Sequence, residues 1–181
     1  MRIQRLLYPK KRAAGWAPFV ATVLLMGTGA MVLPAWQQQA KPFMKWVDED
    51  VVYIISAQER VAFLELTTDP QREKFIEQFW LLRDPTPGTV VNEFKEEHYR
   101  RIGYANERFA GASAGWRTDR GHMYILYGPP DEIESHLSGT AGRRPWDDWL
   151  YYHIDGIGER VIMTFVDEAG EYRMTRDPRG R

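Results

Sequence analysis

A short segment of the chain gathers residue types that bind anions and transfer protons. Together with two acidic residues beyond a Gly-Pro-Pro turn, its polar members are Arg117, Thr118, Asp119, Arg120, His122, Asp131 and Glu132. Arginine guanidinium groups hold anionic ligands through paired hydrogen bonds, and a carboxylate or an imidazole transfers a proton. One interpretation is therefore a hydrolase pocket in which Asp119, His122 and Asp131 are the catalytic candidates. Arg117 and Arg120 would bind the ligand there.

The same segment also has a structural interpretation. The side chains of Thr118 and Asp119 are of the kind that accept hydrogen bonds from nearby backbone N–H groups and hold a tight turn. Gly115 and Gly121 free the backbone, and Trp116 would pack into the core against the helices. A turn of this composition needs no ligand, so we favour the structural interpretation over the catalytic one.

Other chemistry is scarce in this chain. Without cysteine there is no disulfide, no thiolate and no lipid anchor on an N-terminal cysteine. No HExxH motif and no helical histidine pair occurs. We therefore expect no metal site and no cofactor, although neighbouring strands could assemble His122, His136 and His153. No serine lies in a GxSxG elbow, and Ser135 and its neighbour His136 would point to opposite faces of a strand.

Aromatic residues near the C-terminal end form a second candidate region for binding. Trp146, Trp149 and Tyr151 are the candidates for contact with a partner. Alternation along a strand places Trp149 and Tyr151 on one face and Leu150 and Tyr152 on the other. One face must cover the helices. The other is either exposed, and then suits a protein, peptide or glycan partner, or is covered by loops.

Three helices are expected to come before the strands. A capping box at Ser56 and Glu59 starts a helix over about 57–66, and Thr68-Asp69-Pro70 starts another that continues to about residue 83. An apolar stripe predicts a third helix over 90–110. The residues expected to face the core are Val61, Phe63, Leu64, Phe75, Ile76, Phe79, Trp80, Leu82, Val91, Phe94, His98, Ile102, Ala105 and Phe109.

Short apolar or alternating runs predict the strands. A brief run at 51–55 precedes the first helix, and after Gly111 further runs occur at 122–127, 132–137, 147–154, 160–166 and 171–175. Turn residues separate the later runs, which favours an antiparallel meander of four to five strands. Helices followed by strands predict an α+β domain over 48–176, with a helical part at 56–110 and a β part at 115–176.

The N-terminal end has the layout of an export signal. No charged residue lies between Ala13 and Ala40, and the stretch Trp16–Trp36 is long enough to cross one hydrocarbon core. Residues 1–36 are therefore either a retained transmembrane anchor or a cleaved signal peptide, and a buried core helix is a third reading. Residues 37–47 would be a linker and residues 177–181 a tail. In the first two readings the domain beyond Lys41 lies outside the cytoplasm.

Charge is divided unevenly along the chain. Residues 1–12 contain no acid, so with a formal net charge of −1 for the whole chain the remainder carries −6. The basic residues of that first segment are Arg2, Arg5, Lys10, Lys11 and Arg12. An acidic domain repels a phosphate backbone, so we expect no nucleic-acid partner.

The segment Gly115-Trp116-x-Thr118-Asp119 resembles the signature of the GWxTD domain family. Similarity extends over most of residues 46–176, including 75–80, 83–88, 92–102, 104–109, 149–152 and 165–167. The loop at 143–148 is more charged than the family pattern. The resemblance implies a bacterial protein that commonly bears an export signal and whose biochemical role is uncharacterised. It implies no catalytic residue.

These observations together lead to two expectations about function. The first is an exported or inner-membrane-anchored cell-envelope module that binds an envelope protein or another envelope component. The second is an envelope hydrolase with a polar site around the segment that contains Asp119 and His122. In both cases the domain would be periplasmic or secreted.

Overall fold

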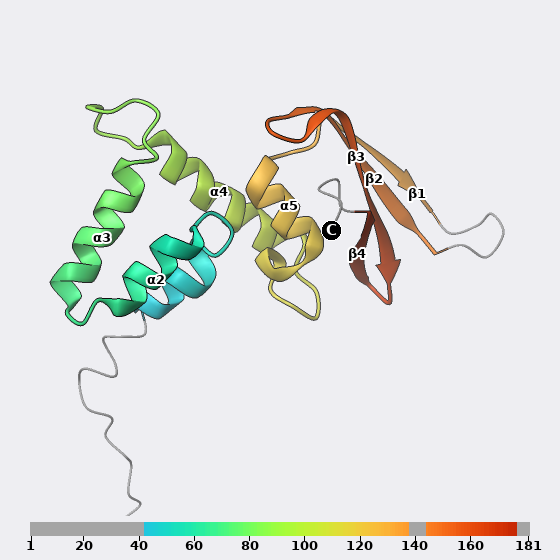
Figure 1. The fold of residues 1–181 in the computed structure, drawn as a ribbon. Coiled ribbons are helices and arrows are strands. Elements are labelled where there is room, and N and C mark those ends of the chain that lie inside the picture. The colour runs from blue at the N-terminus through green and yellow to red at the C-terminus, as the bar shows by residue number, and fades with distance from the viewer. Residues whose placement is uncertain (1–41, 138–143, 177–181) are drawn as a thin grey trace, which may run out of the picture. The chain divides into compact units, whose positions relative to one another are not determined.

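The computed structural model describes residues 42–137 and 144–176, in which helices precede an antiparallel sheet (Figure 1). The elements are η1 (Trp46–Asp50), α2 (Ala57–Glu65), α3 (Asp69–Leu81), α4 (Glu93–Arg108), η2 (Gly115–Arg117), α5 (Asp119–Tyr127), β1 (Glu132–His136), β2 (Trp146–Ile154), β3 (Gly158–Glu168) and β4 (Glu171–Arg176). The predicted α+β class is therefore confirmed.

The predicted signal or anchor at 1–36 and the tail at 177–181 lie outside the described residues. Within the part that the structure describes, no helix has the length and apolar character needed to cross a membrane.

One hydrophobic core lies among the N-terminal helices. Its buried members come from η1, α2, α3 and the turn after η1, and Trp46 is at its centre. The Trp46 ring lies 5.0 Å from that of Phe63 and 5.1 Å from that of Phe79. The predicted capping box starts α2, because Ser56 accepts a hydrogen bond from the Glu59 N–H and Glu59 accepts one from the Ser56 N–H.

Two predictions for this part of the chain are wrong. Residues 51–55 form turns rather than a strand, and residues 42–50, most of which fell in the predicted linker, are helical. The N–H groups of Ile54 and Ile55 both donate to the Val51 carbonyl oxygen. Val51 is fully buried in the helical core, so packing outweighs the strand preference of this run.

The prediction of which side chains face the core is also only partly correct. Phe63, Phe79 and Trp80 are buried, whereas Val61, Leu64 and Leu82 are exposed, as are Val91 and Phe94. At about 100° per residue, Val61 lies roughly 200° around α2 from Phe63, and Leu64 roughly 100°. A nine-residue helix that packs on one side therefore buries Phe63 alone.

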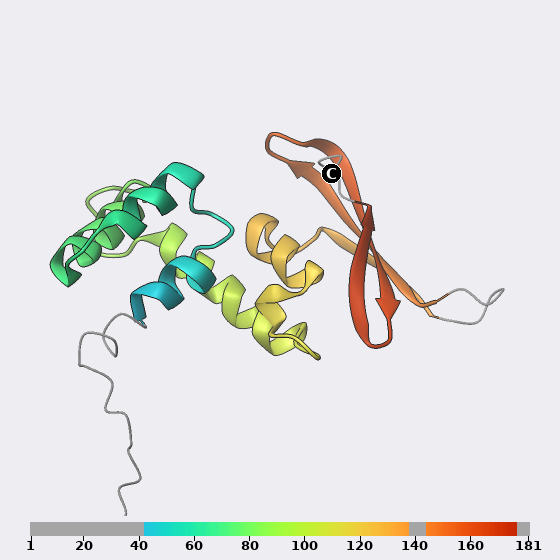
Figure 2. The ribbon, with the colours of Figure 1, turned by 60° about the horizontal axis from the view of Figure 1, so that its bottom comes forward.

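Helix α4 lies between the N-terminal helices and α5 in both ribbon views (Figures 1 and 2). On one side, the Nε2 atom of buried His98 lies 2.6 Å from the backbone oxygen of Asp50. Burial lowers the pKa of His98; the charge of Arg101 adds to this effect, and the hydrogen bond to Asp50 opposes it. On the other side, fully buried Ala105 faces η2.

The strands form a meander in the order β1-β2-β3-β4, with antiparallel neighbours. The predicted meander is thus confirmed with four strands among the described residues. A second core lies on one face of this sheet, which we call the inner face. It contains Met123 and Tyr124 of α5 together with Trp149, Met163 and Phe165 of the strands.

The strand predicted at 122–127 is wrong, because these residues belong to helix α5. The Gly121 N–H donates to Thr118 Oγ1, which caps the helix. Met123, Tyr124 and Ile125 are consecutive and all buried, since α5 packs against both α4 and the sheet. A short helix buried on two sides shows a continuous apolar run, and such a run cannot be told from a strand by its period.

Candidate functional site

The polar segment at 115–122 packs closely on α4. A Cβ atom on Gly115 would lie 1.9 Å from the Ala105 carbonyl oxygen, and one on Gly121 would lie 1.9 Å from the Gly115 oxygen. Both positions therefore admit only glycine without a backbone shift. The Trp116 N–H donates to Asn106 Oδ1 at 3.0 Å, which holds η2 against α4.

Two side chains of the segment are used to hold its own backbone. Thr118 is 3% exposed, and its hydroxyl donates to the Gly115 oxygen at 2.8 Å while accepting from the Gly121 N–H at 3.1 Å. Asp119 Oδ2 accepts from the Met174 N–H at 2.7 Å. Because β4 is at one edge of the sheet, Asp119 fastens the start of α5 to that edge.

The Tyr53 hydroxyl also reaches this segment. It donates to the Trp116 carbonyl oxygen at 3.0 Å. Burial raises the pKa of Tyr53; the charge of Arg117 opposes this change and that of Asp119 adds to it. The hydroxyl therefore stays protonated at neutral pH and keeps its role as donor.

A cleft of about 370 Å³ opens where α4, α5, the Gly-Pro-Pro turn, β1 and β2 meet. This volume is within the range of pockets that hold small ligands. Its aromatic and apolar walls are Tyr104, Phe109, Tyr124, Trp149, Pro130 and Ile133. The Trp149 indole N–H finds no acceptor among the described residues.

Charged groups line the same cleft. Arg120 donates to Asp147 Oδ2 at 3.1 Å, and the Ser135 hydroxyl donates to Asp147 Oδ1 at 2.7 Å. The Arg120 guanidinium also lies 3.8 Å from the centre of the Tyr172 ring. Arg108 and Glu107 complete the charged lining from the end of α4. A cleft of this kind, with aromatic walls and a few placed charges, suits ligand or side-chain binding.

Comparison with known families supplies the remaining observation. The model of the GWxTD domain family matches residues 36–178. This chain belongs to the GWxTD domain family. Neither a curated protein nor a solved structure matches it. In this GWxTD domain, glycine, threonine and aspartate of the signature all serve the packing of η2 and α5 against α4 and β4.

The catalytic candidates have separate partners. Asp119 binds the β4 backbone, and the His122 ring stacks on that of Tyr53 with centres 3.9 Å apart. Asp131 lies beyond the other end of α5, where it accepts from the Tyr152 N–H at 2.6 Å. The structure therefore does not gather the three into one site.

The binding candidates divide among three places. Arg120 and Trp149 meet in the cleft, whereas Arg117 is exposed and lies over the Trp116 ring. Trp149 and Tyr151 are only 2% and 3% exposed, so they lie on the face that covers the helices, and Trp149 forms part of the cleft wall. The Tyr151 hydroxyl donates to the Gly128 oxygen, and burial raises the pKa of this tyrosine.

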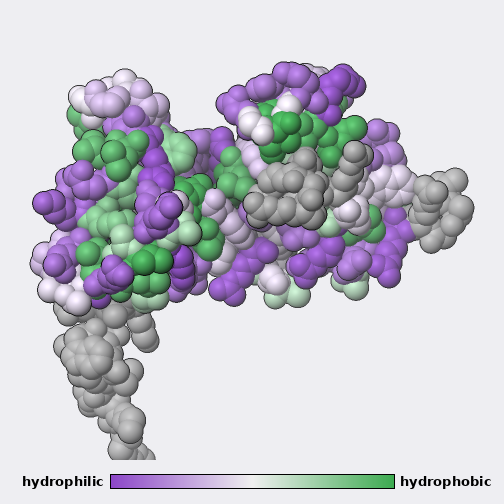
Figure 3. Space-filling view, in the orientation of Figure 1, coloured by the Kyte–Doolittle hydropathy of each residue, from purple (hydrophilic) through white to green (hydrophobic). Residues whose placement is uncertain are grey.

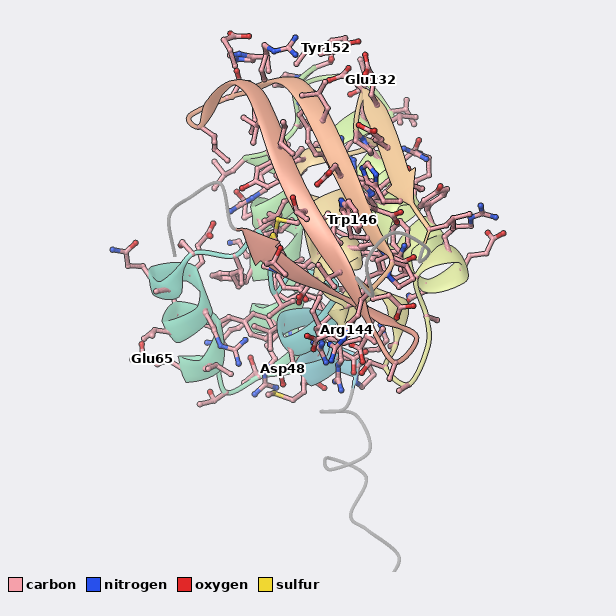
Figure 4. All side chains as sticks on the ribbon, turned by 90° about the vertical axis from the view of Figure 1, so that its right-hand side faces the viewer. Asp48, Glu65, Glu132, Arg144, Trp146 and Tyr152 are labelled. Carbon is pink, nitrogen blue, oxygen red and sulfur yellow. The ribbon has the colours of Figure 1, made fainter. Side chains whose placement is uncertain are left out.

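Trp146 lies on the opposite face, which we call the outer face of the sheet. Its ring stacks on that of His136 at 4.2 Å, and its indole N–H donates to Asp148. Thr164 also donates to Asp148. Figure 4 looks onto this face, with the helices behind the strands.

Histidines do not converge either. His98 is buried on α4, His122 lies on helix α5 rather than on a strand, and His153 contacts Asp155 and Glu159. The strand assembly of His122, His136 and His153 therefore does not form. Within residues 42–137 and 144–176 no group of three His, Asp or Glu side chains could hold a metal ion.

The pair of Arg120 and Asp147 was not predicted from the sequence. A signal for it was present, because strand alternation places Asp147 on the same face as Trp149 and Tyr151. A carboxylate on the core face of a sheet needs a cation or several donors, and Arg120 is that cation. The aromatic wall contributed by Tyr104 and Phe109 depends on how α4 meets the sheet, for which no local signal exists.

Proposed function

We propose that this GWxTD domain is a non-catalytic interaction module that binds an envelope protein or another envelope component. The cleft carries this proposal, because its aromatic walls are partly open and the fold leaves them room for a bound group. Residues 1–36 would deliver the domain across the inner membrane, as a retained anchor or as a cleaved signal, so that it acts in the periplasm or outside the cell.

No observation favours the hydrolase. Asp119 and Asp131 already accept hydrogen bonds from backbone N–H groups, at 2.7 and 2.6 Å, in two different places. The same groups account for the packing of α5 and the start of the sheet. A binding function does not require these carboxylates to lie in one site.

The test compares two tyrosines of α4. Tyr104 is 36% exposed and lines the cleft, whereas Tyr99 is 37% exposed and lies away from it. The full-length protein and the variants Tyr104→Ala and Tyr99→Ala would be crosslinked in native cells, and their companions would be identified by mass spectrometry. Thermal unfolding would show that each variant folds.

We expect one recurrent companion with the unchanged protein and with Tyr99→Ala, and a loss of at least about tenfold with Tyr104→Ala, which corresponds to about 1.4 kcal/mol. Equal recovery with both variants would remove the cleft from the interaction. The absence of any recurrent companion would contradict the proposed function itself.

A further inference from the structure

We propose that the partner docks as an extended segment that adds a strand to the free edge of β1. Its side chains would alternate between apolar groups that enter the cleft and basic groups that face Glu132 and Glu134. This inference rests on the proposed interaction function and names the chemistry of the partner. Strand addition joins backbone hydrogen bonds, which give affinity, to pockets for alternate side chains, which give specificity.

The two edges of the sheet differ. At the β4 edge, Asp119 accepts from the Met174 N–H and Arg120 packs on Tyr172, so α5 covers this side. At the other edge, no described element pairs with β1 on the side away from β2. An edge strand presents unpaired N–H and C=O groups to any extended chain that approaches.

The inner side of β1 leads into the cleft. Ile133 is 56% exposed, and it lines the cleft together with Tyr104 and Pro130. A strand added to β1 would lie about 4.8 Å away, so its inward side chains would stand beside Ile133 over the same walls. An edge strand that served only the fold would gain little from an exposed isoleucine at this position.

The outer side of β1 sets the charge of the partner. Glu132 and Glu134 lie opposite Leu150 and Asp148 of β2, which places acidic groups along one strip of the outer face. The Glu134 side chain is 77% exposed and lies 3.6 Å from the Nε2 atom of His136. Figure 4 shows Glu132 and Tyr152 at one end of this face. Opposite charges across neighbouring strands attract, so lysine or arginine at alternate positions fits this strip.

Protection against aggregation is the competing explanation for charges on an edge strand. It accounts for Glu132 and Glu134, but it gives no reason for the cleft beneath them. Apolar side chains are also visible between hydrophilic ones over the strands in the space-filling view (Figure 3). The cleft and the acidic strip lie on opposite sides of β1. This arrangement suits an extended peptide in which apolar and basic side chains alternate.

The test uses synthetic peptides and the full-length protein. The probe is a fluorescently labelled, amidated seven-residue peptide in which lysine alternates with valine and phenylalanine. Two further peptides carry backbone N-methyl groups on alternate residues. The first is methylated along one edge of the strand and the second along the other edge. Fluorescence anisotropy would measure the dissociation constants.

We expect the probe to bind, and only one of the two N-methylated peptides to lose binding, because strand addition uses one edge of the peptide. Glu134→Lys should weaken binding about tenfold. The matched control is Glu159→Lys, whose carboxylate on β3 has a similar exposure of 75% and also contacts a histidine, and this change should leave binding unaltered.

Equal binding of both N-methylated peptides, or no binding of the probe at about 1 mM, would overturn the strand-addition proposal. Equal effects of Glu134→Lys and Glu159→Lys would overturn it as well. In each case the crosslinking experiment with Tyr104→Ala decides separately whether the domain is an interaction module.

Discussion

At the scale of single residues, the signature of this domain serves the packing of its helices and sheet. Gly115 and Gly121 let backbones approach, Thr118 caps α5, and Asp119 holds the edge of β4. The identity of each residue follows from a contact that another side chain would spoil. The polar character that suggested a catalytic pocket thus has a sufficient explanation in the fold.

Gly115→Ala is expected to destabilise the domain by about 3 kcal/mol or more, because the new Cβ would meet the Ala105 carbonyl oxygen at 1.9 Å. Gly103→Ala is the matched control on α4, where a Cβ meets nothing within 4 Å. It should stabilise by about 0.5–1 kcal/mol through helix propensity. Urea unfolding measures both changes, and a mild effect of Gly115→Ala would contradict the packing role.

The buried pair of Arg120 and Asp147 is expected to be strongly coupled. Their side chains are 20% and 11% exposed, so loss of one partner leaves a largely buried charge. Arg120→Met alone should cost about 3 kcal/mol, whereas Arg120→Met with Asp147→Leu should cost clearly less than the sum of the single changes. Urea unfolding of the single and double variants measures the coupling.

The exposed pair of Arg144 and Glu168 provides the control for this comparison of single and double variants. Its coupling energy should be at most about 1 kcal/mol. A similar coupling in both pairs would mean that burial does not strengthen the Arg120 interaction.

At the scale of elements, cap and turn residues predicted the structure correctly, whereas the apolar runs at 51–55 and 122–127 predicted strands that do not form. The cap at Ser56 and the turns between β2, β3 and β4 are encoded within a few residues. Residues 119–127 are helical, and Val61 and Leu64 are exposed. Both facts depend on which helix and sheet surfaces pack together, and the hydrophobic period of a single sequence does not indicate that. Arg120 and Trp149 were predicted as binding residues of two separate regions, but the cleft that joins them was not predicted, because its walls come from elements far apart in the chain.

The contact of α4 with η1 is expected to weaken in mild acid. Burial lowers the pKa of His98 below its usual 6.5, so the unfolded chain takes up a proton before the folded one does. The contribution to stability is therefore fully present above pH 6.5 and is lost as the pH falls below it. Urea unfolding at pH 7.5 and at pH 5.5 should show lower stability at the acidic pH, and His98→Gln should reduce that difference.

Glu97 titrates outside this window, and His153 contributes with the opposite sign. Hydrogen bonds from Arg100 and Arg101 lower the pKa of Glu97 to about 2, so its contribution is lost only as the pH falls below about 4.5. Asp155 and Glu159 raise the pKa of His153, whose contribution is present below pH 6.5 and is lost as the pH rises through the raised pKa. If His98→Gln kept the same difference in stability between pH 7.5 and pH 5.5, His98 would not be the group that causes this difference.

At the scale of the whole molecule, the family match covers the helices and the sheet together. The signature joins η2 and α5 to α4 and β4, and thereby positions the walls of the cleft. In this chain Gly115, Thr118 and Asp119 of the signature therefore support the cleft without lining it.

Export is a prediction that depends on the N-terminal sequence. Fusion of residues 1–47 to a reporter enzyme that is active only after disulfide formation outside the cytoplasm should give activity in a bacterial host. Replacing two central apolar residues, Val23→Asp and Leu24→Asp, should abolish it. Equal activity of the altered fusion, or no activity of the original, would contradict the proposed envelope location.

The proposed partner binds the full-length protein at the β1 edge and the adjoining cleft. The most direct measurement replaces Ile133 with a photoreactive p-benzoylphenylalanine in native cells. The control replaces Ile162, which lies on the outer face of β3 and is 46% exposed, close to the 56% of Ile133. We expect a crosslinked adduct from position 133 and none from position 162. No adduct at position 133, or an adduct only at position 162, would contradict it.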